Sequence, residues 1–217
     1  MKAHLLLTLG LALGLPLLSG CQSAYYSAME KVGFEKRDIL VDRVEDTRDA
    51  QEDAQQQFSS ALDQFSQLIN FEGGELQDVY ENLKDQYEAS ESSAQRVTDR
   101  IDKVESVAED LFDEWQEELE QYSNESLRRD SSRKLKETQR RYDDLLRSMR
   151  RAESKMAPVL SALQDNVLYL KHNLNASAIG ALQGEYGNIK RDIDQLIKEM
   201  NSAIAQSNDF IASIRQG

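Results

Sequence analysis

The feature that most constrains the fold of this chain is an apolar seam that recurs from residue 40 to residue 214. Its steps alternate between four and three residues, and the average of 3.5 keeps one side of an α-helix against a partner helix. In the first segment only Thr47 and Gln51 are polar. The members there are Leu40, Val44, Thr47, Gln51, Ala54, Phe58, Ala61, Phe65 and Leu68. This pattern predicts a long amphipathic helix with one buried face.

Three further segments show the same alternation, from Tyr80 to Trp115, from Leu135 to Leu174 and from Ile179 to Ile214. The second seam is expected to end with Val104, Ala108, Leu111 and Trp115. The third is expected to take two successive steps of four, through Ala152, Met156 and Leu160. The sequence therefore predicts an all-α fold, with helices over about 35–69, 75–122, 125–174 and 177–215.

The breaks between these segments differ in strength. Asn70, Gly73 and Gly74 combine a helix stop with residues that adopt turn conformations easily. Asn173, Asn175 and Ser177 supply a stop and an N-cap before the last segment. The break at Ser123-Asn124 has no proline or glycine. Two architectures are compatible with this: a long antiparallel, coiled-coil-like bundle of four helices, or one continuous central helix from Leu76 to Leu174 with two flanking helices.

Charge favours the bundle. Acidic residues crowd the end of the second segment, between Glu109 and Glu120, and basic residues crowd the start of the third, between Arg128 and Arg141. Each group opposes the dipole of its own helix, at about 0.3 to 1 kcal/mol for each favourable placement lost. A reversal at Ser123 would lay the two groups side by side and offset this cost.

Two irregularities are candidate functional features. Gly180, Gly184 and Gly187 share one face of the fourth segment, away from its seam. Such a strip would permit close approach of another helix, from this chain or a second copy, or it would simply mark a frayed helix start. Pro158 removes a helical hydrogen bond and clashes with the preceding turn, so it predicts a kink, with or without a hinge function.

The N-terminus has the pattern of a secretory signal for lipid attachment. Lys2 and His4 precede an apolar run from Leu5 to Leu18, and Leu18-Ser19-Gly20-Cys21 contains the only cysteine. The run is shorter than the roughly 20 residues of a membrane-spanning helix and contains Pro16. We expect residues 1–20 to be a signal peptide, Cys21 to carry the lipid, including palmitate-type chains, residues 21–34 to be a tether, and residues 35–217 to be the helical domain.

Composition excludes several classes of partner. The chain without residues 1–20 has 25 basic and 39 acidic side chains, a net charge of −14. Nucleic acid is not expected as a partner, because affinity for phosphate backbones comes from clustered lysine and arginine. The same balance disfavours a protein that lies flat on an anionic membrane surface.

The sequence has few residues suited to catalysis or metal binding. His172 is the only histidine after residue 20, and no thiol remains once Cys21 carries lipid. A zinc site or a nucleophile–histidine pair is therefore not expected within one chain. The acidic run between Glu109 and Glu120 lacks the loop glycine and alternating ligands of a calcium site. We predict no catalytic residues, no metal site and no cofactor.

The stretch from Tyr26 to Phe65, which Tyr25 precedes, resembles a family of helical bacterial lipoproteins known as a domain of unknown function. The resemblance extends over most of the chain after residue 20. It implies an exported, coiled-coil-like protein with no assigned activity. Similarity to bacterial lipoproteins in general also implies outer-membrane sorting, because Gln22 rather than aspartate follows the lipidated cysteine.

These observations predict a cell-envelope lipoprotein, anchored by its N-terminal lipid and facing the periplasm, with a structural or protein-interaction role. We expect a protein partner or self-association, and no enzyme activity. The alternative is a carrier that holds a lipid or a hydrophobic peptide in the core of the bundle.

Overall fold

The computed structural model describes residues 35–70, 73 and 75–216, and the statements below concern these residues. The part of the chain so described forms four long α-helices within one compact unit that begins at Lys36. These are α2 (Lys36–Ile69), α3 (Leu76–Glu118), α4 (Glu125–His172) and α5 (Ala176–Gln216), and a short 3₁₀ helix, η1 (Leu119–Gln121), follows α3. The predicted all-α bundle is confirmed.

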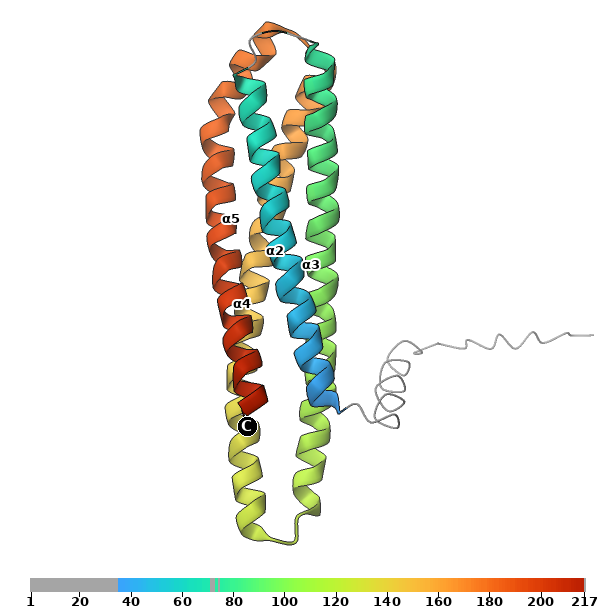
Figure 1. Cartoon of the computed structure of the whole chain (residues 1–217), viewed down its shortest axis with the longest axis vertical. Coiled ribbons are helices and arrows are strands. Elements are labelled where there is room, and N and C mark those ends of the chain that lie inside the picture. The colour runs from blue at the N-terminus through green and yellow to red at the C-terminus, as the bar shows by residue number, and fades with distance from the viewer. Residues whose placement is uncertain (1–34, 71–72, 74, 217) are drawn as a thin grey trace, which may run out of the picture. The chain divides into compact units, whose positions relative to one another are not determined.

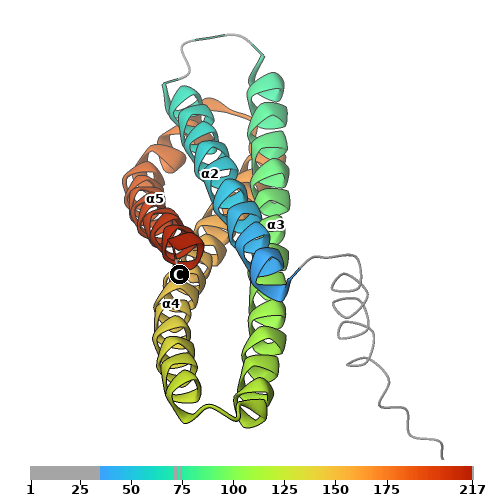
Figure 2. The same ribbon diagram turned by 60° about the horizontal axis from the view of Figure 1, so that its bottom comes forward.

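Each helix packs against two neighbours. α2 and α4 both contact α3 on one side and α5 on the other. Consecutive helices run in opposite directions, as Figures 1 and 2 show. Because the chain reverses between α3 and α4, the alternative of one continuous central helix is wrong.

Asn124 begins α4 directly after this reversal. Its Oδ1 accepts hydrogen bonds from the backbone N–H groups of Ser126, at 2.9 Å, and Leu127, at 3.3 Å. Asparagine is a favoured N-cap because its side chain pairs donors that the first helical turn leaves open. The reversal therefore depends on a helix cap, with no need for glycine or proline.

The apolar seams meet in the core, but several predicted seam positions are not buried, among them Leu174, which is 38% exposed. Near the end of α3, Leu111 and Trp115 are half-buried, whereas Phe112 and Leu119 are buried. In α4, Leu160 is half-buried and its neighbour Val159 is buried. The predicted seam positions at Leu111 and Leu160 are wrong because two adjacent apolar residues compete there, and the partner helix decides between them.

Pro158 lies on an exposed position inside α4, and the helix continues on both sides of it. The buried residues Met156, Val159 and Leu163 keep steps of three and four across it. The two successive steps of four, which supported the predicted kink, are therefore not present in the buried seam. The kink itself stays a prediction.

The core also contains polar side chains at the predicted seam positions. The hydroxyls of Thr47 and Ser207 donate to backbone carbonyls of their own helices, at 2.8 and 2.9 Å. Gln51 has 0% of its surface exposed, and neither atom of its amide has a hydrogen-bond partner in the structure. A buried amide without a partner costs about 1 to 3 kcal/mol, so Gln51 weakens the core where it lies.

Candidate functional site

The end of the α3–α4 hairpin projects beyond the other two helices. We call residues 115–141 the hairpin tip; they comprise the end of α3, η1, the turn and the start of α4. Figures 1 and 2 show that this hairpin continues past the first turn of α2 and the last turn of α5. Along the rest of the hairpin, α2 and α5 cover one side of α3 and α4. At the tip they do not, so the side chains there are open to other molecules.

Contacts between α3 and α4 hold the tip together. Trp115 Nε1 donates to Ser131 Oγ at 2.8 Å, and Leu119 is buried. At the base of the tip, the rings of Phe112 and Tyr142 meet edge to face, with centroids 5.3 Å apart. These contacts fix the spacing of the two helices up to the turn.

The two arms of the hairpin have opposite charge. From Glu109 to Gln121 the chain has seven acidic and no basic side chains. From Glu125 to Arg141 it has seven basic and three acidic side chains, a local net charge of +4. Both sets lie at the helix end whose dipole disfavours them.

The predicted offset between these arms does not take the form of ion pairs. Within residues 75–216, no ion pair joins the acidic run from Glu109 to Glu120 to the basic run from Arg128 to Arg141. Arg128 and Arg129 instead contact Glu125, at 2.9 and 3.9 Å, within α4. The two groups lie on neighbouring antiparallel helices, as predicted, and the size of the offset stays a prediction.

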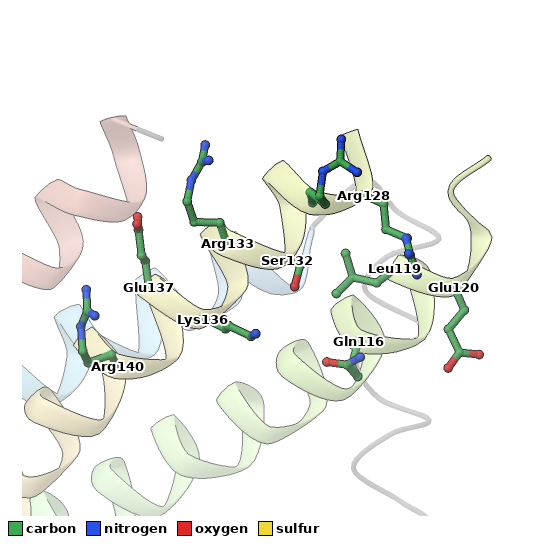
Figure 3. A pocket seen from close by; sticks show the side chains of 10 residues that line it. Gln116, Leu119, Glu120, Arg128, Ser132, Arg133, Lys136, Glu137 and Arg140 are labelled. Carbon is green, nitrogen blue, oxygen red and sulfur yellow. The ribbon is translucent and has the colours of Figure 1, made fainter. Parts of the chain in front are cut away.

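A groove of about 810 Å³ lies between the arms at the tip. Figure 3 shows its lining side chains, most of which come from α4. Five of them are cationic: Arg128, Arg129, Arg133, Lys136 and Arg140. Only two acidic residues, Glu120 and Glu137, share the lining.

The groove cations differ in how they are paired. Arg133 pairs with Asp130 of its own helix. Lys136 and Arg140 have no ion-pair partner among the residues that the structure describes. The groove therefore offers at least two cations for which the chain provides no counter-charge within ion-pair distance.

Arg150, further along α4, shows the opposite arrangement. Its guanidinium donates to Asp102 at 2.7 Å and Glu105 at 2.5 Å on α3, and to Glu153 at 3.0 Å on α4. Burial alone would lower the pKa of Arg150, but these hydrogen bonds raise it overall. The charge of Arg150 is therefore used in contacts between and within the helices of the bundle.

Tyr142 lies at the base of the tip with its hydroxyl buried and without a partner. Burial raises the pKa of this phenol, and the nearby carboxylates of Glu105 and Glu109 raise it further. Tyr142 therefore stays neutral to a higher pH than an exposed tyrosine does.

Among the described residues, the glycine strip contacts no other helix. Gly180, Gly184 and Gly187 are exposed on α5, and a Cβ atom added at any of them would have nothing within 4 Å. The predicted close approach is therefore not found for α2, α3 or α4. Contact with a second copy stays a prediction.

The remaining candidate residues have no contacts that indicate a site. His172 is exposed in the last turn of α4. The lipidation residue Cys21, like the predicted signal peptide and tether, lies outside the described residues. In the described ranges, no three histidine, cysteine or acidic side chains come together as metal ligands. Across those ranges, no helix has the length and apolar character of a membrane span.

The sequence matches a family described as a protein of unknown function (DUF2959) over residues 25–214. The chain belongs to this family. No curated protein and no solved structure matches it. Membership in DUF2959 confirms the resemblance to a family of unknown function and assigns no activity to the bundle.

Proposed function

We propose that this DUF2959 protein is an envelope lipoprotein, attached to a membrane through lipid on Cys21, that has a structural or protein-interaction role in the periplasm. The attachment is supported by Leu18-Ser19-Gly20-Cys21 at the end of the apolar N-terminal run. Outer-membrane sorting is supported by Gln22, through similarity to bacterial lipoproteins. We also expect the protein to have no catalytic activity.

The observation that carries the interaction role is the hairpin tip. It projects beyond α2 and α5, and its groove presents Lys136 and Arg140 without counter-charges from the described chain. Lys136 and Arg140 make no ion pair within the described chain, so no salt bridge of theirs contributes to the stability of the bundle. A surface that projects and is not used for folding is suited to contact another molecule.

The carrier alternative has less support. It needs room for an apolar ligand between the helices, but the chain's own side chains occupy the seams. Phe58, Phe65 and Met149 have 0% exposure, and the same is true of Leu163 and Leu170. A bound lipid would have to displace several of these residues.

Labelled palmitate tests the attachment. Bacteria that produce the full chain should incorporate the label into it, and the Cys21→Ser variant should remain unlabelled and leave the membrane fraction. Ser19→Ala, which keeps a small residue before the cysteine, is the matched control and should be labelled. An unlabelled wild-type chain would contradict the proposed attachment.

Site-specific photocrosslinking in intact cells tests the interaction role. A photoreactive residue in place of Lys136 or Arg140 should give a reproducible adduct, because these side chains line the projecting groove. The same residue in place of Lys198, which is exposed on α5 and has no ion-pair partner in the described chain, is the control. Equal adducts at both places would argue against a dedicated surface at the tip.

A further inference from the structure

The hairpin tip lies at the end of the bundle where the chain enters it. α2 begins at Lys36, whose Nζ lies 3.0 Å from Oε2 of Glu114 on α3. From Glu114 to Gln121 the chain continues away from this point for about 10 Å, at 1.5 Å per residue. Figure 1 shows α3 and α4 extending past the first turn of α2. The tip therefore projects from the end of the bundle at which α2 begins, with Lys36.

The length of the segment that precedes α2 allows the tip to reach a membrane. Residues 22–35 connect the proposed lipid site to α2. An extended chain of this length spans at most about 50 Å. This is more than the distance by which the tip passes Lys36, so attachment at Cys21 leaves the tip free to meet the bilayer surface.

The turn at the tip exposes apolar side chains. Leu127 is 57% exposed and Tyr122 is 39% exposed, on either side of the turn. Tyrosine is enriched at the level of lipid headgroups, where its ring contacts apolar groups while its hydroxyl stays in water. Two such side chains at a projecting turn are suited to shallow insertion.

The groove supplies the charge that anionic headgroups need. Arg128, Arg129, Arg133, Lys136 and Arg140 line it, and arginine pairs well with phosphate because its planar guanidinium forms two parallel hydrogen bonds. Each cation near an anionic membrane surface contributes about 1 kcal/mol of attraction. The acidic run that ends at Glu120 on the other arm would be repelled, so the α4 side of the tip should face the lipid.

We propose that the hairpin tip is a second membrane contact, which binds anionic lipid headgroups in the same bilayer that holds the lipid on Cys21. This inference rests on the lipid attachment proposed above, and it assigns the groove to lipid headgroups in place of a protein. A protein adduct at position 136 or 140 in the crosslinking experiment would contradict it. The mature chain has a net charge of −14, which disfavours adsorption of the whole bundle, so the contact is confined to the tip. Attachment at Cys21 raises the effective concentration of the tip at the surface, and a weak contact is then sufficient.

The test uses the mature lipidated protein in vesicles of phosphatidylethanolamine and phosphatidylglycerol. An environment-sensitive fluorophore is attached to Leu127→Cys, since lipid already occupies Cys21. The matched control is Leu168→Cys, which is 51% exposed on the same helix but lies toward its other end. Lipids that carry a doxyl quencher should reduce emission from position 127 and leave position 168 unchanged.

The charge requirement is tested in the same vesicles. Replacing Lys136 and Arg140 together by glutamine should weaken the contact about 30-fold, for two cations at about 1 kcal/mol each. The control pair Lys171→Gln and Lys198→Gln removes the same charge from exposed positions outside the tip and should have no effect. Vesicles of phosphatidylcholine alone should also lose most of the quenching at position 127.

Three results in these vesicles would overturn the proposal. One is a lipidated protein whose probe at position 127 is not quenched, which would leave the attachment at Cys21 unaffected. Another is quenching that the removal of Lys136 and Arg140 does not change. The third is an emission change at position 127 that grows with protein density without doxyl quenching, which would indicate a second copy at the tip. A chain that never acquires lipid would contradict this proposal and the proposed attachment together.

Discussion

The body of the bundle and the hairpin tip use charge in different ways. In the body, where α2 and α5 cover α3 and α4, ion pairs cross between helices. Arg100 on α3 pairs with Asp46 on α2 at 2.6 Å, and Arg215 on α5 pairs with Glu45 at 2.8 Å. In the tip, the cations of α4 pair only with neighbours on α4 or have no ion pair within the described chain.

This difference separates residues that serve folding from residues that do not. Ion pairs between exposed side chains contribute at most about 1 kcal/mol each to the free energy of unfolding. In the body, however, these pairs join helices that pack against each other. At the tip, each arm holds charge that its own helix dipole disfavours, and within the described chain no ion pair between the α3 and α4 arms offsets it. We therefore expect stability to depend on the body, and contacts with other molecules to depend on the tip.

The largest effect should come from an apolar side chain in the body. Phe65 is fully buried and its ring stacks on Tyr186, with centroids 6.1 Å apart. Phe65→Ala should lower the free energy of unfolding by about 3 to 5 kcal/mol, because it leaves a cavity. Leu127→Ala at the tip should change it by less than about 0.5 kcal/mol. Urea unfolding followed by circular dichroism measures both, and equal losses would remove the distinction between body and tip.

Gln51→Leu should stabilise the body. The amide of Gln51 is buried without a hydrogen-bond partner, and leucine has a similar size without the cost of that buried polar group. We expect the free energy of unfolding to rise by about 1 to 3 kcal/mol. Gln55→Leu, at a half-buried position one turn later, is the control and should give a smaller change. A loss of stability in Gln51→Leu would mean that ordered water pairs with the amide.

Asn124→Ala should affect the tip selectively. It removes the side-chain oxygen that accepts from Ser126 and Leu127, at a cost of about 1 kcal/mol to the first turn of α4. Hydrogen exchange should become faster at the start of α4 and stay unchanged in α2. Asn124→Asp keeps an acceptor and should preserve the wild-type exchange. Uniform acceleration along all helices would show that the tip unfolds only with the body.

Tyr142→Phe should raise the free energy of unfolding at neutral pH by about 1 kcal/mol or less, because it removes a buried hydroxyl that has no hydrogen-bond partner in the structure. The ordinary pKa of a tyrosine is 10.0, and burial raises the pKa of Tyr142 above it. The folded state therefore holds this proton more tightly, and its contribution to stability is complete below pH 10 and declines as the pH rises toward the raised pKa.

Unfolding measured across this alkaline range should show a shallower loss of stability in Tyr142→Phe than in the wild type. Tyr169→Phe, at an exposed position of the same helix, should behave as the wild type does. Identical alkaline profiles for Tyr142→Phe and the wild type would indicate that the buried phenol ionises without affecting the fold.

The sequence was sufficient to predict the fold class, because the 3.5-residue seam can be satisfied only by burying one face of each helix. It also located the opposite charges on either side of Ser123. It did not predict how they pair, because an ion pair depends on side-chain distances. Lys136 and Arg140 were recognisable only as members of a charged run, since a groove exists only once α3 and α4 lie together.

The sequence by itself determined that four amphipathic helices form, since the period of a seam depends only on residues along one chain. The tertiary structure decided which of two adjacent apolar residues is buried, as at Val159 and Leu160, because that choice depends on the opposing helix. It also decided that α2 starts beside Glu114 and leaves the tip uncovered. The register between helices is set by packing of many side chains at once, which a pattern along one helix does not contain.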